Sequence, residues 1–395
     1  MIFLSLRVKN FFSFRDVFLD FAIQRKLLKS TIPDESLEGY KNFHFRRVCI
    51  ISGVNASGKT ALGRLMLEIQ LFILKDNTSS NKLRDYLFDK SEAGVIEVEF
   101  VMPQNKRVCL HRLKLTINQD QSVPVIEYAE IPLRATDTVN SARLRLNKNE
   151  ASNIFRVETS KDKELDALYA FRERIKEAQQ GSCGWFYSFS SVTSDTRKIP
   201  MSSESLNRKI LEDIVTTFDP TIIKVTENKD ESDKTQAFSL IFKNHDSVVL
   251  DMEGAVTKPE RLSKGTYEAL KVAIFLNRII DDRNYCEAFH DNGPIVYYLD
   301  EAMAYVHTEL EQLTLSLLIA HLPRHAQLFY TTHNYDVLDM NLPVHSYVFM
   351  SKDEEGTSIV QPEQIINKND RSLLNYVKNN VFNTLPDMSK MELLL

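Results

Sequence analysis

Gly53-Val54-Asn55-Ala56-Ser57-Gly58-Lys59-Thr60, which reads G-x-x-x-x-G-K-T, is the stretch on which the fold depends. It follows an apolar run at 48–51 that is typical of a buried strand, and it precedes residues 61–74, where apolar side chains recur at helical spacing. A glycine loop between a strand and a helix binds phosphate, because its backbone N–H groups turn inward and the helix N-terminus adds its dipole. Only 11 of the 395 residues are glycine, so two glycines in one loop of this length are more than chance would give.

This stretch predicts a nucleotide site, with two side chains in defined roles. We expect Lys59 to reach the β- and γ-phosphates, and the Thr60 hydroxyl to ligate Mg²⁺. The expected nucleotide-binding residues are Gly53, Asn55, Ala56, Ser57, Gly58, Lys59, Thr60 and Ala61.

Composition sets broad limits on the class of protein. Hydrophobic residues make up 43% and charged residues 26% of the chain, as in ordinary soluble globular proteins. The net charge of −5 gives no global signal for nucleic acid or anionic membrane, so any DNA contact would come from a local patch. The four cysteines form no C-x-x-C pair, and the N-terminus lacks the pattern of a signal peptide. We expect a cytoplasmic protein with no membrane association.

The chain before residue 150 reads mainly as strands around the nucleotide loop. Two strands around a turn are expected in residues 2–21, followed by strands at 95–101, 108–115 and 123–131, with a hairpin turn at 103–106. These strands predict an antiparallel sheet beside a parallel core. Arg134, Arg143, Arg145 and Lys148 form a basic run, which reads better as a solvated face than as a contact to phosphate backbone.

The pattern of residues changes at 151–257, and we assign this segment to an inserted α+β lobe. Helices are expected at 161–180 and 205–218, a serine-rich turn region at 185–194, and strands within 222–250. No heptads are sustained, which excludes long coiled-coil arms. Residues 1–150 and 258–395 would then form the core domain.

Two acids end the apolar strand pattern that begins at Ile295. Asp300, at the end of the strand, can hold the Mg²⁺ shell, and Glu301 can accept a proton from an attacking water. A strand ending in two solvated acids is common, and the loop at 53–60 is what favours the catalytic interpretation.

Two further elements follow the same order along the chain. Leu262-Ser263-Lys264-Gly265-Thr266 precedes an apolar helix at 267–280, where Ser263 is either an N-cap or part of an anion site. Taken alone, capping is the better interpretation. The strand pattern ending in Thr331-Thr332 runs into His333, a histidine that would be structural if it stood by itself.

In this order the four elements resemble the head of ABC-type ATPases. The resemblance implies an α/β P-loop NTPase fold: a mixed sheet with helices on both faces, an antiparallel sheet and an inserted lobe. It implies that 53–60 is the Walker A loop, 295–301 the Walker B strand and 262–266 a signature motif that departs from L-S-G-G-Q. It also implies that Glu301 is the catalytic base, that His333 contacts the γ-phosphate, and that Ser263, Lys264 and Gly265 bind in trans the ATP held by a second copy.

More narrowly, Asn10-Phe11-Phe12-Ser13-Phe14 followed by G-x-N-x-S-G-K-T is similar to the opening of the SMC/RecF/OLD branch. The compact chain, with its ending at 370–386, resembles ATPases of abortive-infection and phage-defence systems of the AbiL, PARIS AriA or Septu type. The lobe-joining glutamine stays open among Gln104, Gln119 and Gln121. His307 matches a histidine that these proteins often carry after the Walker B acids.

The resemblance implies an ATPase that uses ATP and Mg²⁺, forms a homodimer or a larger homo-oligomer, and controls a separate effector protein such as a nuclease. We expect the effector to be separate, because about 60 residues after His333 are too few for an appended nuclease domain. The alternative is a RecF/SMC-like DNA-binding ATPase of DNA repair. No base-reading motif separates ATP from GTP, so ATP rests on the resemblance.

Overall fold

The computed structural model describes residues 1–25, 27, 30–75, 81–103, 107–121, 123–148, 155–158, 164–179, 181–189, 206–366, 373–382, 384 and 392. Contacts divide the chain into two compact units, and each is described by itself. Unit 1 comprises Met1–Tyr187, Asp291–Tyr297 and Arg324–Leu395, and unit 2 comprises Ser188–His290 and Tyr298–Pro323.

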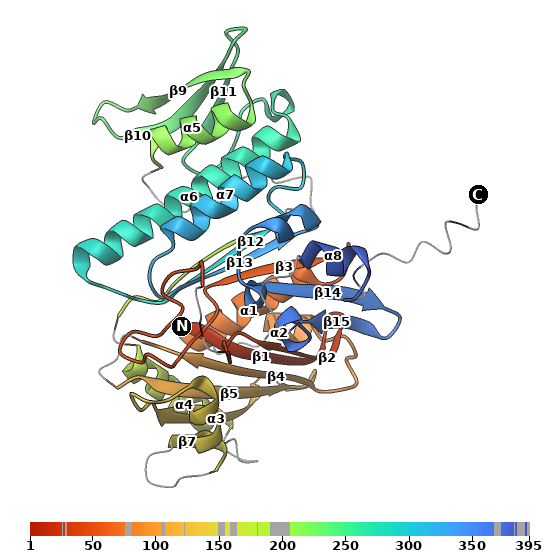
Figure 1. Ribbon diagram of the computed structural model, residues 1–395. Helices are drawn as coiled ribbons and strands as arrows, with labels where there is room; N and C mark the ends of the chain where they lie inside the picture. Colours follow the sequence, from red (N-terminus) through yellow and green to blue (C-terminus); the bar gives the residue numbers. More distant parts are fainter. Residues whose placement is uncertain are drawn as a thin grey trace. The chain divides into compact units, whose positions relative to one another are not determined.

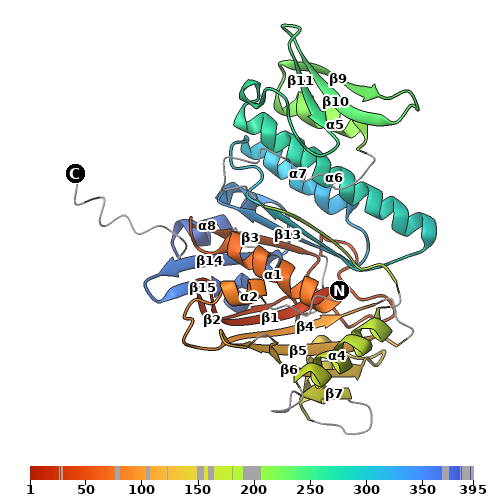
Figure 2. The same cartoon turned by 180° about the vertical axis from the view of Figure 1, so that it is seen from behind.

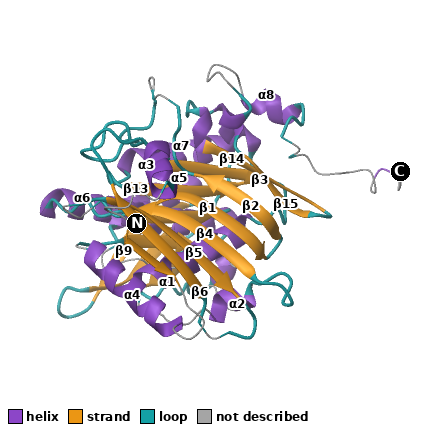
Figure 3. Ribbon diagram, turned by 90° about the horizontal axis from the view of Figure 1, so that it is seen from below, coloured by secondary structure: helices purple, strands orange, loops and turns teal. Residues whose placement is uncertain are grey.

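An antiparallel sheet in unit 1 is formed by strands in the order β2-β1-β4-β5-β6-β7, of which β2, β1, β4, β5 and β6 run side by side in Figure 3. Side chains alternate between the two faces of β4, as the sequence pattern predicts. The predicted antiparallel sheet is therefore confirmed. The strands are β1 (Ile2–Phe11), β2 (Phe14–Asp20), β4 (Gly94–Val101), β5 (Cys109–Ile117), β6 (Val125–Pro132) and β7 (Phe155–Glu158).

A second six-stranded sheet has the order β15-β14-β3-β13-β12-β8 (Figure 1). Its strand β3 pairs in parallel with β13 and with β14, and every residue of β3 is buried. A strand covered on both faces reads as an unbroken apolar run, which explains the pattern at 48–51. The strands are β3 (Val48–Gly53), β8 (Gly184–Ser188), β12 (Ile295–Asp300), β13 (Ala326–Thr332), β14 (Tyr347–Asp353) and β15 (Gly356–Val360), of which β14 and β15 pair antiparallel.

Helix α1 (Lys59–Leu74) follows β3 directly and is seen with α2 (Asn81–Asp85) in orange in Figure 2. The predicted apolar stripe of α1 is buried, from Leu62 to Ile73, and the helix contacts β3 and α4. Helices α3 (Val139–Asn147) and α4 (Glu164–Ala178) contact β6 of the antiparallel sheet, and α8 (Leu373–Lys378) contacts the short helix η2 (Tyr335–Asp339).

Unit 2 combines a small sheet with two longer helices. Strands β9 (Ile222–Lys229), β10 (Thr235–Phe242) and β11 (Ser247–Asp251) pair antiparallel in the order β11-β10-β9. Helix α5 (Arg208–Phe218) contacts both β9 and α6 (Lys264–Phe289), and α6 contacts α7 (Thr308–His321). Among the helices that the structure describes, α6 is the longest with 26 residues.

Several elements differ from the sequence predictions. Strand β8 overlaps the start of the predicted turn region at 185–194, because Trp185, Phe186 and Tyr187 favour a strand more than the serines beyond them favour a turn. Helix α3 covers most of the basic run, where no helix was predicted, and β14 and β15 were also not predicted. Residues 104–106 of the predicted hairpin turn lie outside the described residues.

The predicted domains, 1–150 with 258–395 and the lobe 151–257, stay a prediction, and the two units group the elements differently. Strand β7 and helix α4 belong to unit 1, whereas α6 and α7 belong to unit 2 together with β9, β10 and β11. Unit 2 therefore contains residues 262–266 together with the small sheet. Within the described part of the chain, no helix is both long and apolar enough to cross a bilayer.

Candidate nucleotide site

The loop between β3 and α1 can be built only with glycine at both ends. A Cβ atom added to Gly53 would lie 2.1 Å from the carbonyl oxygen of Met350 in β14. Gly58 has a φ of 104°, and a Cβ atom there would lie 3.2 Å from the ring of Phe14. Between them, Ala56 has a φ of 61°, which a side-chain-bearing residue rarely adopts. Strain of this kind occurs at functional loops more often than elsewhere.

Lys59 is the first residue of α1, and its side chain turns back into the loop. The residue is 3% exposed, and its Nζ donates hydrogen bonds to the carbonyl oxygens of Gly53 at 2.8 Å and Val54 at 3.1 Å. A buried ammonium held by the carbonyls of its own loop can exchange them for the oxygens of an anion.

His333 follows the end of β13 and meets Lys59 from the other side. Its Nδ1 lies 3.0 Å from the carbonyl oxygen of Gly53 and 3.3 Å from Lys59 Nζ. The carbonyl only accepts and the ammonium only donates, so one Nδ1 cannot satisfy both. The tautomer therefore decides whether Nδ1 donates to Gly53 or accepts from Lys59. The structure thus brings together Gly53, Lys59 and His333, which the sequence predicted as parts of one site.

Two residues that the sequence did not predict hold the loop in place. Thr357, in β15, donates its hydroxyl proton to the carbonyl oxygen of Ser57 at 2.9 Å. The Ser13 hydroxyl lies 2.7 Å from Thr357 Oγ1 and must be the donor there, because the single proton of Thr357 is already used. The turn between β1 and β2 and the hairpin of β14 and β15 therefore both support the loop.

The loop fits a bound phosphate on three observations from unit 1. Ser57 Oγ is buried and has no hydrogen-bond partner among the described residues, which is unusual for a buried hydroxyl. No side chain caps the N-terminus of α1, and its first turn carries no acid that would repel an anion. Lys59 supplies a positive charge, while Asn55 and Ala56 are exposed at the tip of the loop.

The two predicted acids lie at the end of β12, in unit 2. Asp300 is the last residue of the strand and is 1% exposed. Glu301 has a φ of 44°, so the chain leaves the strand through a left-handed turn at a non-glycine residue. A buried acid followed by a strained one is the backbone arrangement that a metal-binding and proton-accepting pair would use.

Ser263 caps α6, as the capping interpretation predicted. Its Oγ accepts from the backbone N–H of Thr266 at 3.0 Å. Thr266 Oγ1 donates to Asp219 at 2.8 Å, so the 2.7 Å contact between the two hydroxyls uses the Ser263 proton. Burial works to raise the pKa of Asp219, but hydrogen bonds from Thr221 and Thr266 outweigh it and lower that pKa. Ser263 and Lys264 are exposed, and Gly265 is partly exposed.

The remaining sequence candidates form no hydrogen bond or ion pair with the loop among the described residues, or lie outside those residues. Gln104 is outside the described residues, and Gln119 and Gln121 follow the end of β5. His307 is the N-cap residue of α7, and its side chain makes no capping hydrogen bond.

The interpretation of the basic run as a solvated face is wrong for its two central arginines. Arg143 forms ion pairs with Asp20 at 3.0 Å and Glu99 at 2.6 Å and is mostly buried. Arg145 pairs with Asp137 and is 9% exposed. Helix α3 contacts the sheet, and both arginines form ion pairs with acids of unit 1. They therefore form no surface for binding a phosphate backbone.

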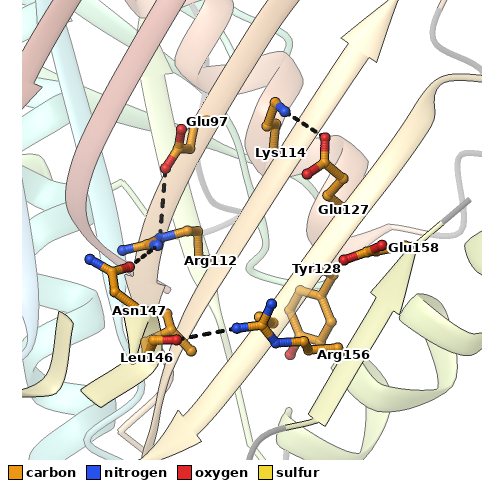
Figure 4. A pocket seen from close by; sticks show the side chains of 10 residues that line it. Glu97, Arg112, Lys114, Glu127, Tyr128, Leu146, Asn147, Arg156 and Glu158 are labelled. Atoms are coloured by element: carbon orange, nitrogen blue, oxygen red, sulfur yellow. Dashed lines mark hydrogen bonds and ion pairs between the residues drawn. The ribbon is translucent and has the colours of Figure 1, made fainter. Parts of the chain in front are cut away.

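Figure 4 shows a groove of about 380 Å³ on the antiparallel sheet, lined by β4, β5, β6, β7 and α3. Its charges neutralise one another: Lys114 pairs with Glu127 at 2.5 Å, and Arg112 lies 3.6 Å from Glu97. Arg156 and Glu158 add one further charge of each sign. A groove with three acids and three bases offers no net attraction for a nucleotide.

Comparison with known proteins gives limited additional information. No protein-family model matches the chain, and no curated protein matches it. Among solved structures, the chain is similar to an SMC head described as "Crystal structure of the SmcHead bound to the C-winged helix domain of ScpA". The identity is 12%, the match covers 91% of this chain and 97% of that chain, and the TM-score is 0.44. At that score the similarity carries no argument.

Proposed function

We propose that this chain binds and hydrolyses ATP, and that two or more copies assemble by sharing ATP between them. The observation that carries the proposal is the buried Lys59 ammonium, held within 3.1 Å of two loop carbonyls between the obligatory glycines Gly53 and Gly58. A cation buried in a glycine loop at a helix N-terminus is suited to a polyphosphate.

The remaining roles follow from the chemistry of each side chain. Lys59 would bind the β- and γ-phosphates, and Thr60 together with Asp300 would hold Mg²⁺ through oxygen ligands. Glu301 would accept a proton from the attacking water, and His333 would donate to the γ-phosphate. Bound ATP with Mg²⁺ would supply the reacting phosphoryl group.

Assembly of two copies would complete the site. Ser263, Lys264 and Gly265 would contact the ATP bound by the loop of the second copy, and the exposure of Ser263 and Lys264 supports this role. The Ser263 hydroxyl would then release Thr266 in order to donate its proton to a phosphate oxygen.

We further propose that ATP binding and hydrolysis control a separate effector protein in antiviral defence. This step rests on the resemblance to compact defence ATPases. Native purification of the Glu301→Gln variant with ATP and Mg²⁺, followed by mass spectrometry, should recover a stoichiometric second protein. Nucleic acid without such a protein would instead favour the RecF/SMC-like DNA-binding alternative.

Nucleotide binding is tested by replacing the loop cation. Lys59→Ala should weaken binding of a fluorescent ATP analogue at least about 30-fold, because it removes a buried charge from the phosphates. Lys82→Ala, which breaks only an exposed pair with Glu68, is the matched control and should bind as the parent does. Equal affinity of the two variants would refute the proposed site. Competition with GTP in the same assay determines the base preference.

A further inference from the structure

Residues 302–307, here called the 302–307 loop, follow Glu301 and are attached to the first turns of α6 within unit 2. All three attachments are made to Tyr305. Its backbone N–H donates to Glu268 at 3.1 Å, and its carbonyl oxygen would lie 3.3 Å from a Cβ atom on Gly265. Lys264 Nζ lies 4.6 Å from the centre of its ring. The Tyr305 side chain is 62% exposed, so core packing does not explain this arrangement.

Burying the carboxylate of Glu268 at this position costs free energy of folding. The residue is only 8% exposed, and among the described residues its one hydrogen bond, from Tyr305, leaves most of the acceptor capacity of its carboxylate unused. Burial raises the pKa of Glu268 to about 7. An apolar side chain of similar size would favour folding more, so stability alone does not account for a carboxylate here.

Charged groups from helices α6 and α7 surround this carboxylate. Lys264 and Lys271 share helix α6 with it, and Glu311 faces it from α7. Burial lowers the pKa of Lys271, against the attraction of Glu268 and of Asp300 at the end of β12. Glu268 therefore lies in one electrostatic cluster with the proposed metal ligand of its own chain.

We propose that Glu268 is a positioning residue that fixes the 302–307 loop to the turn formed by Ser263, Lys264 and Gly265. This inference rests on the proposed assembly of two copies around ATP. The turn carries the residues assigned to the second copy's nucleotide and the 302–307 loop contacts it, so holding the two together presents one preformed surface. Preforming a surface lowers the ordering cost of association and thereby strengthens it.

The test measures self-association by sedimentation in a Glu301→Gln background with saturating ATP and Mg²⁺. Glu268→Leu fills the same space without an acceptor and should weaken association about tenfold. Glu268→Gln keeps an oxygen acceptor for Tyr305 and should restore association to within about threefold of the parent. Glu287→Gln, at the exposed far end of α6, is the matched control and should leave association unchanged.

The readouts separate positioning from folding. Glu268→Leu should unfold at the same temperature as the parent or a higher one, and its affinity for a fluorescent ATP analogue in the unassembled chain should be unchanged. Association as tight as that of the parent in Glu268→Leu, or no rescue by Glu268→Gln, would overturn the inference while the proposed function stands. If the Glu301→Gln parent itself does not assemble with ATP, both the function and the inference fail.

Discussion

A steric contact with Met350, rather than its own backbone conformation, favours glycine at position 53. The sequence explained this glycine by close approach to phosphate, and the structure adds a steric reason, since Met350 O leaves no room for a Cβ atom. Gly53→Ala should therefore lower the free energy of unfolding by about 1–3 kcal/mol and weaken nucleotide binding, because β3 and β14 must separate. Urea denaturation measures the first effect.

Gly39→Ala is the control for this prediction. Gly39 has a φ of 80° with no atom within 4 Å of its Cβ position, so the substitution costs only the backbone strain, about 1 kcal/mol. A smaller loss of stability in Gly53→Ala than in Gly39→Ala would contradict the steric account.

The pH dependence of stability should carry the signature of Glu268. Its pKa rises from an ordinary 4.5 in the unfolded chain to about 7 in the folded one. The folded state then holds a proton that the unfolded state has lost, so this contribution to stability is complete below pH 4.5 and disappears as the pH rises through 7. Unfolding free energies measured from pH 5 to 8 should fall by up to about 3 kcal/mol more in the parent than in Glu268→Gln. Parallel curves for the two proteins would show that the carboxyl titrates normally.

Single residues were predictable where the constraint is local in sequence. Eight consecutive residues define the loop, so Gly53, Gly58 and Lys59 could be assigned to it from the sequence alone. Ser13 and Thr357 could not, because 344 positions separate two hydroxyls that meet at 2.7 Å. The contact made by Glu268 could not be predicted either, since its partner is a backbone N–H of a loop 37 positions away.

At the scale of elements, the start of α6 depends on a chain of hydroxyls from Ser263 through Thr266 to Asp219. Thr266→Val removes one link while keeping the shape of the side chain. The partly exposed Asp219 loses a donor, which should lower the free energy of unfolding by about 1 kcal/mol. Ser263 no longer has Thr266 as an acceptor, so ATP-dependent association should strengthen about two- to fivefold.

Thermal denaturation and sedimentation of Thr266→Val in the Glu301→Gln background measure these two effects. Thr266→Ser, which retains the hydroxyl, should resemble the parent in both. Weaker association of Thr266→Val would mean that the Ser263 proton is not what the second copy receives.

Element prediction succeeded where periodicity was long and failed where it was short. The apolar stripe of α1 and the alternation of β4 each repeat several times, so their type was clear from the sequence. Strand β8 has only five residues, and its aromatic residues stand next to a serine-rich stretch. Helix α6 extends nine residues beyond the predicted end at 280, to Phe289, because polar residues at its exposed end carry no apolar pattern.

At the scale of the whole molecule, the proposed functional residues are divided between two units. Gly53, Lys59 and His333 belong to unit 1, whereas Ser263 and Asp300 belong to unit 2. The order of motifs along the chain predicts that these groups cooperate. The residue pattern predicted domain boundaries at 150 and 258. The units are set by contacts such as those of α5 with α6, which no local pattern encodes.

Association driven by ATP is the central claim, and sedimentation of the Glu301→Gln variant tests it most directly. With saturating ATP and Mg²⁺ the variant should sediment as a species of at least twice the 45.6 kDa of one chain, and without nucleotide as a smaller species. Adding Lys59→Ala to the same variant should abolish the difference. Identical sedimentation with and without ATP, in a protein that binds the nucleotide, would contradict the account.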